Sequence, residues 1–247
     1  MKVELIDYQK NALDLLIYTK NTRLMADETL KTISEWPIEK KLDHLDYMRK
    51  TIQSSFEFVS YTFAISGVSR SFTHQLVRTR KASYAQESQR TVDVRNAEVY
   101  SPSNNAEFDS AAQLAKYTYA NLVDKGVPVQ DAREILPTGI NTSIIMKVDL
   151  RELSHMAEVR LCTRTAGQYQ QVFREMKQRV VEVHPYFGQH IQVACVKTGI
   201  CCFPNYTDCP VQEHTIKVTD EQKGKIECAW ITTDHVANPI AKNGKTM

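Results

Sequence analysis

The sequence predicts an α+β fold, a single domain in which helices and strands alternate along the chain. Apolar residues recur at helical spacing within residues 1–50 and again over residues 107–125. Two other runs, residues 54–65 and 141–150, are rich in aromatic and β-branched side chains, which is typical of strands. Because these runs are scattered between the helices, we expect a mixed arrangement of helix and β-sheet layers.

The N-terminal part is predicted to be helical on both sides of Pro37. Residues 54–65, with the sequence SSFEFVSYTFAI, then form the first strand, and Gly67 is expected to break the pattern after it. The apolar positions that carry the N-terminal helices are Leu5, Tyr8, Leu13, Leu16 and Ile17 before Pro37, and Leu42, Leu45 and Met48 after it.

The middle of the chain is predicted to be mostly helical. A short helix is expected within residues 69–80, and a loop over residues 80–90 follows it. The amphipathic helix over residues 107–125 stops at a glycine, and a proline begins the next helix, residues 128–136. After the strand already described, residues 151–162 return to helical spacing.

The chain length sets the domain organisation. With 247 residues and 42% hydrophobic content, the chain can bury one full core. We expect one main, enzyme-sized domain over residues 1–185. Residues 186–247 are expected to be an irregular, cysteine-containing extension that packs on the same domain.

Overall charge argues against two classes of partner. The formal net charge is +2, from 31 Lys and Arg against 29 Asp and Glu, so no global field favours nucleic acid or an anionic membrane. The N-terminus lacks the apolar segment of a signal peptide, and no apolar run approaches the ~18 residues that a membrane span needs. We therefore expect a cytoplasmic protein that binds neither membrane nor nucleic acid.

The cysteines gather near the C-terminus, which raises the question of a metal site. No C-x-x-C pair is present, and adjacent Cys201 and Cys202 are poorly placed to chelate one ion. Ordinary reduced thiols are favoured over structural zinc, so no metal is predicted, and the expected compartment disfavours disulfides. The six cysteines are Cys162, Cys195, Cys201, Cys202, Cys209 and Cys228.

A basic cluster within residues 70–95 is the first candidate binding site. Six cations stand there against two acids, and Ser and Gln side chains are interleaved with them. Guanidinium groups match phosphate oxygens in forked geometry, while Ser and Gln can bind a base or a sugar. A phosphorylated small molecule fits this composition, and a solvated basic loop is the alternative. The cations are Arg70, Arg78, Arg80, Lys81, Arg90 and Arg95.

The segment HQLVRTRKASYAQESQR, residues 74–90, resembles the signature of the flavin-dependent thymidylate synthases, in which R-H-R is followed at set spacing by S, S and R. The segments AREILP (132–137) and DLRELSHMAEVRLCTR (149–164) resemble the second and third markers of that family, and SSFEF (54–58) resembles its flavin-side segment. The resemblance covers residues 54–183. The residues that match the first signature are Gln75, Arg78, Arg80, Ser83, Ser88 and Arg90.

The chain departs from the usual family pattern at five positions, and none of them removes an arginine. Thr79 stands where the signature has a histidine, Ala85 where Asn is usual, Gln86 where Glu is common, Asp149 where Asn is common, and Phe58 where a histidine often follows the glutamate.

The resemblance implies an FAD-dependent methyltransferase that converts dUMP to dTMP. The one-carbon donor would be 5,10-methylenetetrahydrofolate, NADPH would reduce the flavin, and the enzyme would be a homotetramer with sites built by several subunits. The implied dUMP contacts are Gln75, Leu76, Val77, Arg78, Gln86, Glu87, Ser88, Gln89, Arg90, Arg133 and Arg160. The implied FAD contacts are Ser54, Arg78, Thr79, Arg80, Gln86, Asp149, Leu150, Arg151 and His155.

Arg160 is the residue to which the resemblance assigns catalysis, as the cation that stabilises negative charge on the uracil ring. Arg151 and His155 lie four positions apart and share one helical face, whereas Arg160 points to the opposite side. One helix can therefore serve two ligands. The plain alternatives are a surface arginine at a helix end and a core histidine.

The remaining sequence features shape the expected mechanism. Ser88 has no adjacent base and is assigned to binding rather than nucleophilic attack, and the family chemistry needs no enzyme cysteine. The absence of a G-x-G-x-x-G motif fits NADPH as a visiting substrate. Two alternatives stay open: another C5 modification of dUMP, such as hydroxymethylation, and a non-catalytic protein that binds nucleotides or single-stranded nucleic acid.

Overall fold

The computed structural model describes residues 1–247 apart from residues 103–104, 166, 200, 202–208 and 210–247. It divides into two compact units. The first contains residues 1–6 and 62–147. The second contains residues 7–61 and the described part of residues 148–247.

Most residues of a four-stranded sheet belong to the first unit. Along the strand of residues 141–149, Ile144 and Met146 are buried while Ser143 and Lys147 are exposed, so one face of this strand contributes to the core. In spatial order the strands are β1 (Lys2–Tyr8), β2 (Ser60–Ser69), β4 (Asn141–Asp149) and β3 (Ala82–Gln86).

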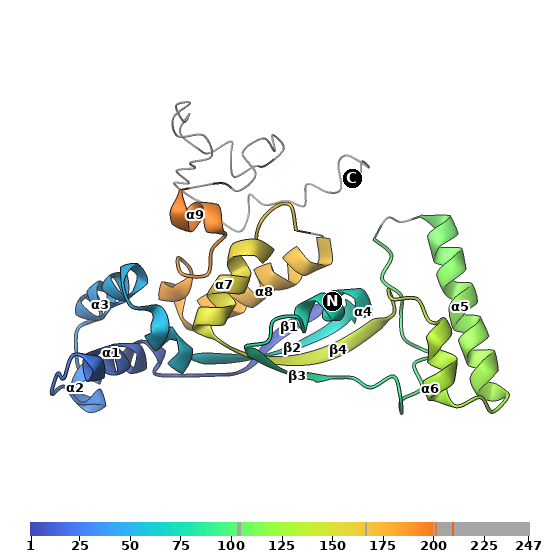
Figure 1. The fold of residues 1–247 in the computed structure, drawn as a ribbon, viewed down its shortest axis with the longest axis horizontal. Helices are drawn as coiled ribbons and strands as arrows, with labels where there is room; N and C mark the ends of the chain where they lie inside the picture. The colour runs from blue at the N-terminus through green and yellow to red at the C-terminus, as the bar shows by residue number, and fades with distance from the viewer. Residues whose placement is uncertain (103–104, 166, 200, 202–208, 210–247) are drawn as a thin grey trace. The chain divides into compact units, whose positions relative to one another are not determined.

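Helices of the first unit follow the strands or pack on one another. The Ser69 hydroxyl caps the helix after β2 by accepting a hydrogen bond from the Phe72 amide at 3.1 Å. Tyr119 and Ala132 are buried in an apolar cluster where the longest helix meets the short ones. The helices are α4 (Arg70–Leu76), α5 (Ala106–Asp124), α6 (Val129–Ala132) and the 3-10 turn η2 (Arg133–Ile135) (Figure 1).

In the second unit, three N-terminal helices and a 3-10 turn pack together, and the remaining helices follow the sheet in sequence. Leu16, Ile17, Leu45 and Met48 are fully buried between the first helices. The elements are α1 (Ala12–Arg23), α2 (Leu30–Ser34), α3 (Ile38–Lys50), η1 (Gln53–Phe58), α7 (Leu150–Arg160), α8 (Gly167–Val183), η3 (Pro185–Phe187) and α9 (Ala194–Thr198).

Three predictions for the first 70 residues were wrong. Leu5 and Tyr8 belong to β1 and not to a helix, because this segment pairs with β2 through main-chain hydrogen bonds. The predicted strand over residues 54–65 begins late, since its first residues form η1 and β2 starts at Ser60. Gly67 does not end the strand; it lies within β2 with a φ of 66°, a conformation that glycine adopts at low cost.

Other elements were missed in the predicted loops. The expected loop over residues 80–90 contains β3, which pairs with β4. Beyond Pro185 the described chain forms η3 and α9 rather than irregular structure alone. The helix over residues 107–125, the strand over residues 141–150 and the helix from residue 151 are confirmed within one or two residues. No helix within the described ranges has the length and apolarity to cross a membrane.

Candidate functional site

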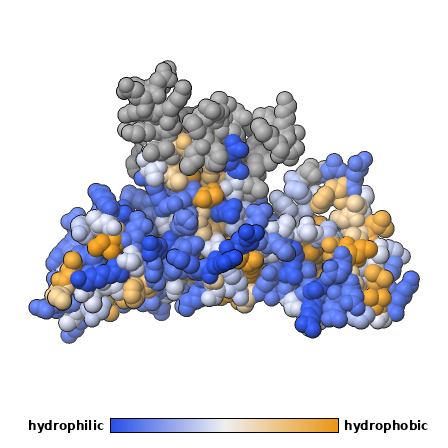
Figure 2. Space-filling model, in the orientation of Figure 1, coloured by the Kyte–Doolittle hydropathy of each residue, from blue (hydrophilic) through white to orange (hydrophobic). Residues whose placement is uncertain are grey.

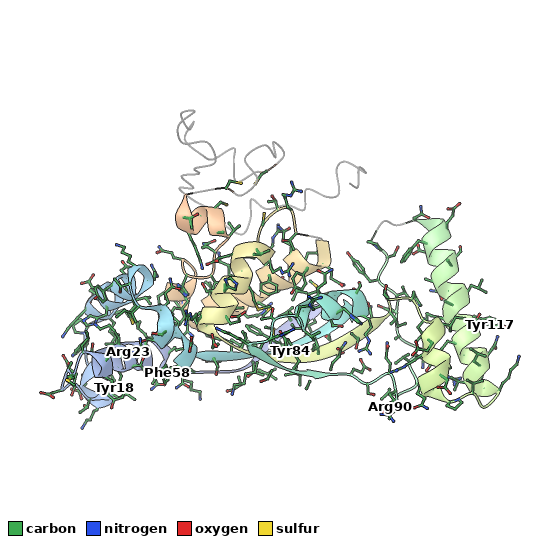
Figure 3. The ribbon with its side chains drawn as sticks, viewed as in Figure 1. Tyr18, Arg23, Phe58, Tyr84, Arg90 and Tyr117 are labelled. Carbon is green, nitrogen blue, oxygen red and sulfur yellow. The ribbon has the colours of Figure 1, made fainter. Side chains whose placement is uncertain are left out.

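The basic cluster lies on α4, β3 and the segments after them. Arg78, Arg80 and Arg90 are exposed, and no guanidinium of the three forms an ion pair with another described residue. Figure 3 shows Arg90 in the segment after β3. Positive groups that lack a carboxylate partner fit the phosphates of a nucleotide or of FAD. The donor set therefore fits the cofactor that the motif implies.

The turn that carries Arg78 is fixed by an aromatic side chain of β3. The Tyr84 hydroxyl lies 2.9 Å from the Leu76 carbonyl oxygen and 3.1 Å from that of Thr79. It therefore ties both ends of the turn to the sheet. Tyr84 stood in the predicted loop, and this positioning role could be recognised only once β3 was placed beside α4.

Gln86 and Glu87 are engaged within the first unit. The Gln86 side-chain amide donates to the Thr73 hydroxyl at 2.8 Å. Glu87 pairs with Ser143 twice: its main-chain amide donates to the Ser143 carbonyl at 3.0 Å, and its carboxylate accepts from the Ser143 amide at 3.1 Å. Both residues thus stabilise the end of β3 next to the exposed arginines.

Gln89 has a feature that points to a bound partner. The residue is 8% exposed, and its buried Nε2 has no hydrogen-bond partner among the described residues. A buried amide group without a hydrogen-bond partner destabilises the fold by about 1–3 kcal/mol. A hydrogen-bond acceptor on a bound ligand would offset that cost. The neighbouring Ser88 hydroxyl accepts from the Arg90 main-chain amide at 3.1 Å, which shapes the turn before Arg90.

Arg133 and Arg70 form a second group of positive charges in the first unit. The segment after Arg133 contacts the first residue of α4 through a hydrogen bond. The Arg70 main-chain amide donates to the Ile140 carbonyl at 3.0 Å. Burial lowers the pKa of Arg70, and the nearby charge of Arg133 lowers it further. Two guanidiniums that repel one another suit an anionic ligand. Arg70 was named in the basic cluster but not among the implied dUMP or FAD contacts, since its nearness to Arg133 depends on a long-range contact.

The flavin-side candidates of the second unit surround η1 and the start of α7. The Arg23 guanidinium donates to the Ser54 hydroxyl, and Arg151 forms an ion pair with Glu57. Arg23 comes from α1 and was not expected at the site; Figure 3 shows it near η1 in this unit. The Asp149 carboxylate caps α7 by accepting from its backbone at 2.7 Å.

Arg160 and His155 differ in their surroundings, as the helical geometry predicts. The guanidinium carbon of Arg160 lies 4.2 Å from the ring centroid of Tyr169, a cation–π contact between α7 and α8. Burial raises the pKa of Tyr169, and Arg160 opposes that rise. The His155 side chain is 72% exposed and its Nδ1 lies 3.5 Å from the Glu158 carboxylate.

The structure places the predicted residues in two groups. Leu76 and Leu150 have 0% exposure, so a ligand could reach only their main chains. The first unit holds Gln75, Leu76, Val77, Arg78, Thr79, Arg80, Gln86, Glu87, Ser88, Gln89, Arg90 and Arg133. The second unit holds Ser54, Asp149, Leu150, Arg151, His155 and Arg160.

Four cysteines share one apolar cluster of the second unit. Burial raises the pKa of the Cys162 thiol. Within the described part of the chain, no group of three or more His, Cys, Asp or Glu side chains is arranged to hold a metal ion. Cys202 and Cys228 lie outside the described residues. The four are Cys162, Cys195, Cys201 and Cys209.

Comparison with known proteins decides the family. Residues 4–186 match the family model described as thymidylate synthase complementing protein. The flavin-dependent thymidylate synthase of Geobacter sulfurreducens is 38% identical over 184 residues, which cover 71% of this chain and 78% of the relative. That of Sulfurisphaera tokodaii is 32% identical over 206 residues, 79% of each chain.

The chain belongs to the flavin-dependent thymidylate synthase family. Its fold is also similar to that of flavin-dependent thymidylate synthase ThyX from Helicobacter pylori, solved with FAD and dUMP. The TM-score is 0.64 at 17% identity, and the match covers 78% of this chain and 100% of the other. The family suggested by the three sequence motifs is thus confirmed.

Proposed function

We propose that this protein methylates dUMP to dTMP, with FAD as cofactor, 5,10-methylenetetrahydrofolate as one-carbon donor and NADPH as reductant. The family membership carries this proposal, because the matched region includes all three motifs that bear the candidate site residues. The exposed, unpaired guanidiniums of the first unit support it independently, since they suit phosphate groups.

The dUMP phosphate would be bound by forked guanidinium contacts. Arg78 and Arg90 can each present two parallel N–H donors to phosphate oxygens, and Arg133 adds a third positive charge beside Arg70. Gln89 would complete the site by donating its unmet Nε2 hydrogen to the nucleotide. These contacts orient the substrate and supply no covalent chemistry.

Flavin contacts are proposed for each unit separately. Arg78 and Arg80 supply charge for its phosphates, while Ser54, Arg151 and His155 supply polar contacts from η1 and α7. When bound, FAD supplies the redox chemistry of the reaction, because no side chain of the twenty amino acids transfers hydride. The protein contributes position and electrostatics.

Arg160 would stabilise the negative charge that develops on the uracil ring. Its contact with the Tyr169 ring restrains the guanidinium, so the cation need not reorganise during the reaction. A cysteine nucleophile is not required by this route. The raised pKa of the Cys162 thiol fits that view, because a protonated thiol is a poor nucleophile.

A homotetramer is part of the proposal. The candidate residues are divided between two units, and in a tetramer one subunit can complete the site of another. On α5, Leu114 and Tyr117 are 65% and 66% exposed, and Figure 2 shows apolar side chains gathered over that helix. Apolar surface of this kind is typical of a face that another chain covers.

The direct test is a visible absorbance spectrum of the purified protein, followed by product analysis with dUMP, methylenetetrahydrofolate and NADPH. Bound flavin and dTMP are expected. Hydroxymethyl-dUMP as the product would replace the proposal with the other C5 modification. A protein that stays colourless when titrated with FAD would overturn the flavin role altogether.

A further inference from the structure

A lysine beyond the region matched by the family model contacts α7. Lys197 lies on α9, eleven residues past the last matched residue, 186. Its ammonium group donates to the Glu158 carboxylate at 2.9 Å and to the Ser154 hydroxyl at 2.5 Å. The lysine side chain is only 19% exposed, so the contact is largely shielded from water.

The contact fixes more than one side chain of α7. Ser154 is itself buried, and its hydroxyl donates to the His190 carbonyl at 2.9 Å. Burial lowers the pKa of Lys197, and Glu158 opposes this by favouring the charged ammonium. A shielded ion pair is costly to break from one side, because the remaining charge keeps no partner.

Glu158 connects this lysine to a flavin-side candidate. One carboxylate oxygen of Glu158 accepts from Lys197, and the other lies 3.5 Å from Nδ1 of His155. Lys197 therefore fixes the position of the Glu158 carboxylate, and that carboxylate restricts the rotation of the exposed His155 imidazole. Orienting a histidine through the partner of its Nδ1 is a common way to set which nitrogen faces a ligand.

We propose that Lys197 is a positioning residue for FAD binding, which acts through Glu158 to orient His155. The inference rests on the proposed function, because it takes His155 as a flavin contact. It gives a role to the segment after residue 186: α9 holds the carboxylate that orients the imidazole. The same segment approaches η1, where the His190 ring stacks on Phe56 at a centroid distance of 4.2 Å.

The test measures the dissociation constant for FAD by fluorescence titration and the visible spectrum of the bound flavin. Lys197→Met is expected to weaken FAD binding about 5-fold, within the range of such indirect coupling. It should also shift the flavin absorbance bands. Lys197→Arg, which keeps a cation, is expected to restore part of the affinity.

Epistasis separates positioning from general stability. In a His155→Ala background, Lys197→Met should cause no further loss of FAD affinity, and the Lys197→Met/Glu158→Gln double variant should bind FAD no worse than the weaker single variant. Lys41→Met is the matched control. It removes a lysine at 12% exposure from an ion pair with Asp14 on α1, and it should leave FAD affinity unchanged.

Each outcome decides between two statements. If the wild-type chain binds FAD and Lys197→Met binds it equally well with the same spectrum, the positioning role is wrong while the proposed function stands. The role is also wrong if Lys197→Met weakens FAD binding equally in the His155→Ala background. If Lys197→Met does not fold, Lys197→Arg and Glu158→Gln supply the same comparison. A wild-type chain that binds no FAD overturns both.

Discussion

Arg160 is the last residue of α7, and its planar guanidinium packs against the aromatic ring of Tyr169 on α8. The stacking on Tyr169 leaves the guanidinium partly exposed, so it can still donate to a ligand. A cation that is already oriented stabilises a developing negative charge without first reorganising. The flavin-side candidates Arg151 and His155 occupy another face of the same helix.

Replacing Arg160 should therefore damage chemistry more than cofactor binding. Arg160→Ala is expected to reduce dTMP formation about 10²–10³-fold, equivalent to ~2.7–4 kcal/mol, while FAD content stays near the wild-type level. Arg160→Lys should recover only part of the rate, because an ammonium lacks the planar fork. Flavin content, flavin reduction by NADPH and dTMP yield are measured together. Loss of FAD along with activity would show that the residue has a different role.

His190 links pH to the stability of the fold. Burial, with smaller contributions from Lys197 and Arg49, lowers the pKa of His190 to about 3. The folded state keeps the imidazole neutral, while the unfolded chain takes up a proton below its ordinary pKa of about 6.5. Stability from this group is therefore complete above that value and is lost as pH falls toward 3.

From pH 7 to pH 5, His190 should account for a loss of about 2 kcal/mol in the free energy of unfolding. His190→Gln should be less stable at pH 7 but should lose about that much less on acidification. Urea unfolding at both pH values measures the difference. An identical loss in wild type and variant would mean that the folded His190 takes up its proton near the ordinary pKa.

Among the elements, the N-terminus of α7 contributes both to the stability of the fold and to the position of candidate site residues. Asp149 ends β4 and caps α7, and the first amide of α7, that of Leu150, donates to the Val59 carbonyl at 2.7 Å. The cap and this hydrogen bond set where the helix begins, and so where Arg151 and His155 point. Asp and Asn are equally good caps, so the chain's departure from the usual Asn keeps the helix start intact.

Removing the cap should weaken both stability and cofactor binding. Asp149→Ala is expected to cost about 1 kcal/mol in the free energy of unfolding and to weaken FAD binding, whereas Asp149→Asn should preserve stability. Asn105→Ala is the control, because Asn105 caps α5 with hydrogen bonds of 2.9 and 3.1 Å. The control should lose similar stability and keep its FAD affinity. Equal FAD affinities in Asp149→Ala and Asn105→Ala would show that the α7 cap has no part in the flavin site.

On the scale of the whole molecule, the candidate site is divided. The phosphate-binding candidates belong to the first unit and Arg160 to the second. A site that combines the two can be completed within a chain or between subunits. The proposed tetramer favours completion between subunits, and the exposed apolar residues of α5 support such an assembly.

Mixing two inactive variants distinguishes these arrangements. Arg90→Ala and Arg160→Ala, unfolded together and refolded as a mixture, should regain about a quarter of the wild-type sites if each site takes the two residues from different chains at random. Light scattering after size-exclusion chromatography measures the assembly, and dTMP formation measures the recovery. A mixture no more active than the mean of its two components would place both residues in the same chain's site.

The sequence by itself determined the family and most of the helices. Helical periodicity depends on residues within a few positions of each other, so α5 and α7 could be predicted. The motifs around Arg78 and Arg160 could likewise be recognised from residues close together in sequence, without knowing which other segments they contact. The tertiary structure alone decided that Leu5 and Tyr8 lie in a strand and that residues 82–86 pair with β4.

The same distinction applies to the site. Motif spacing could not reveal that Arg70 stands near Arg133, or that Lys197 reaches Glu158 across 39 positions of sequence. Strand pairing and ion pairs of this kind join segments far apart in the chain. Their formation depends on which segments the core brings together. The sequence pattern within one segment therefore cannot predict which other segment it will contact.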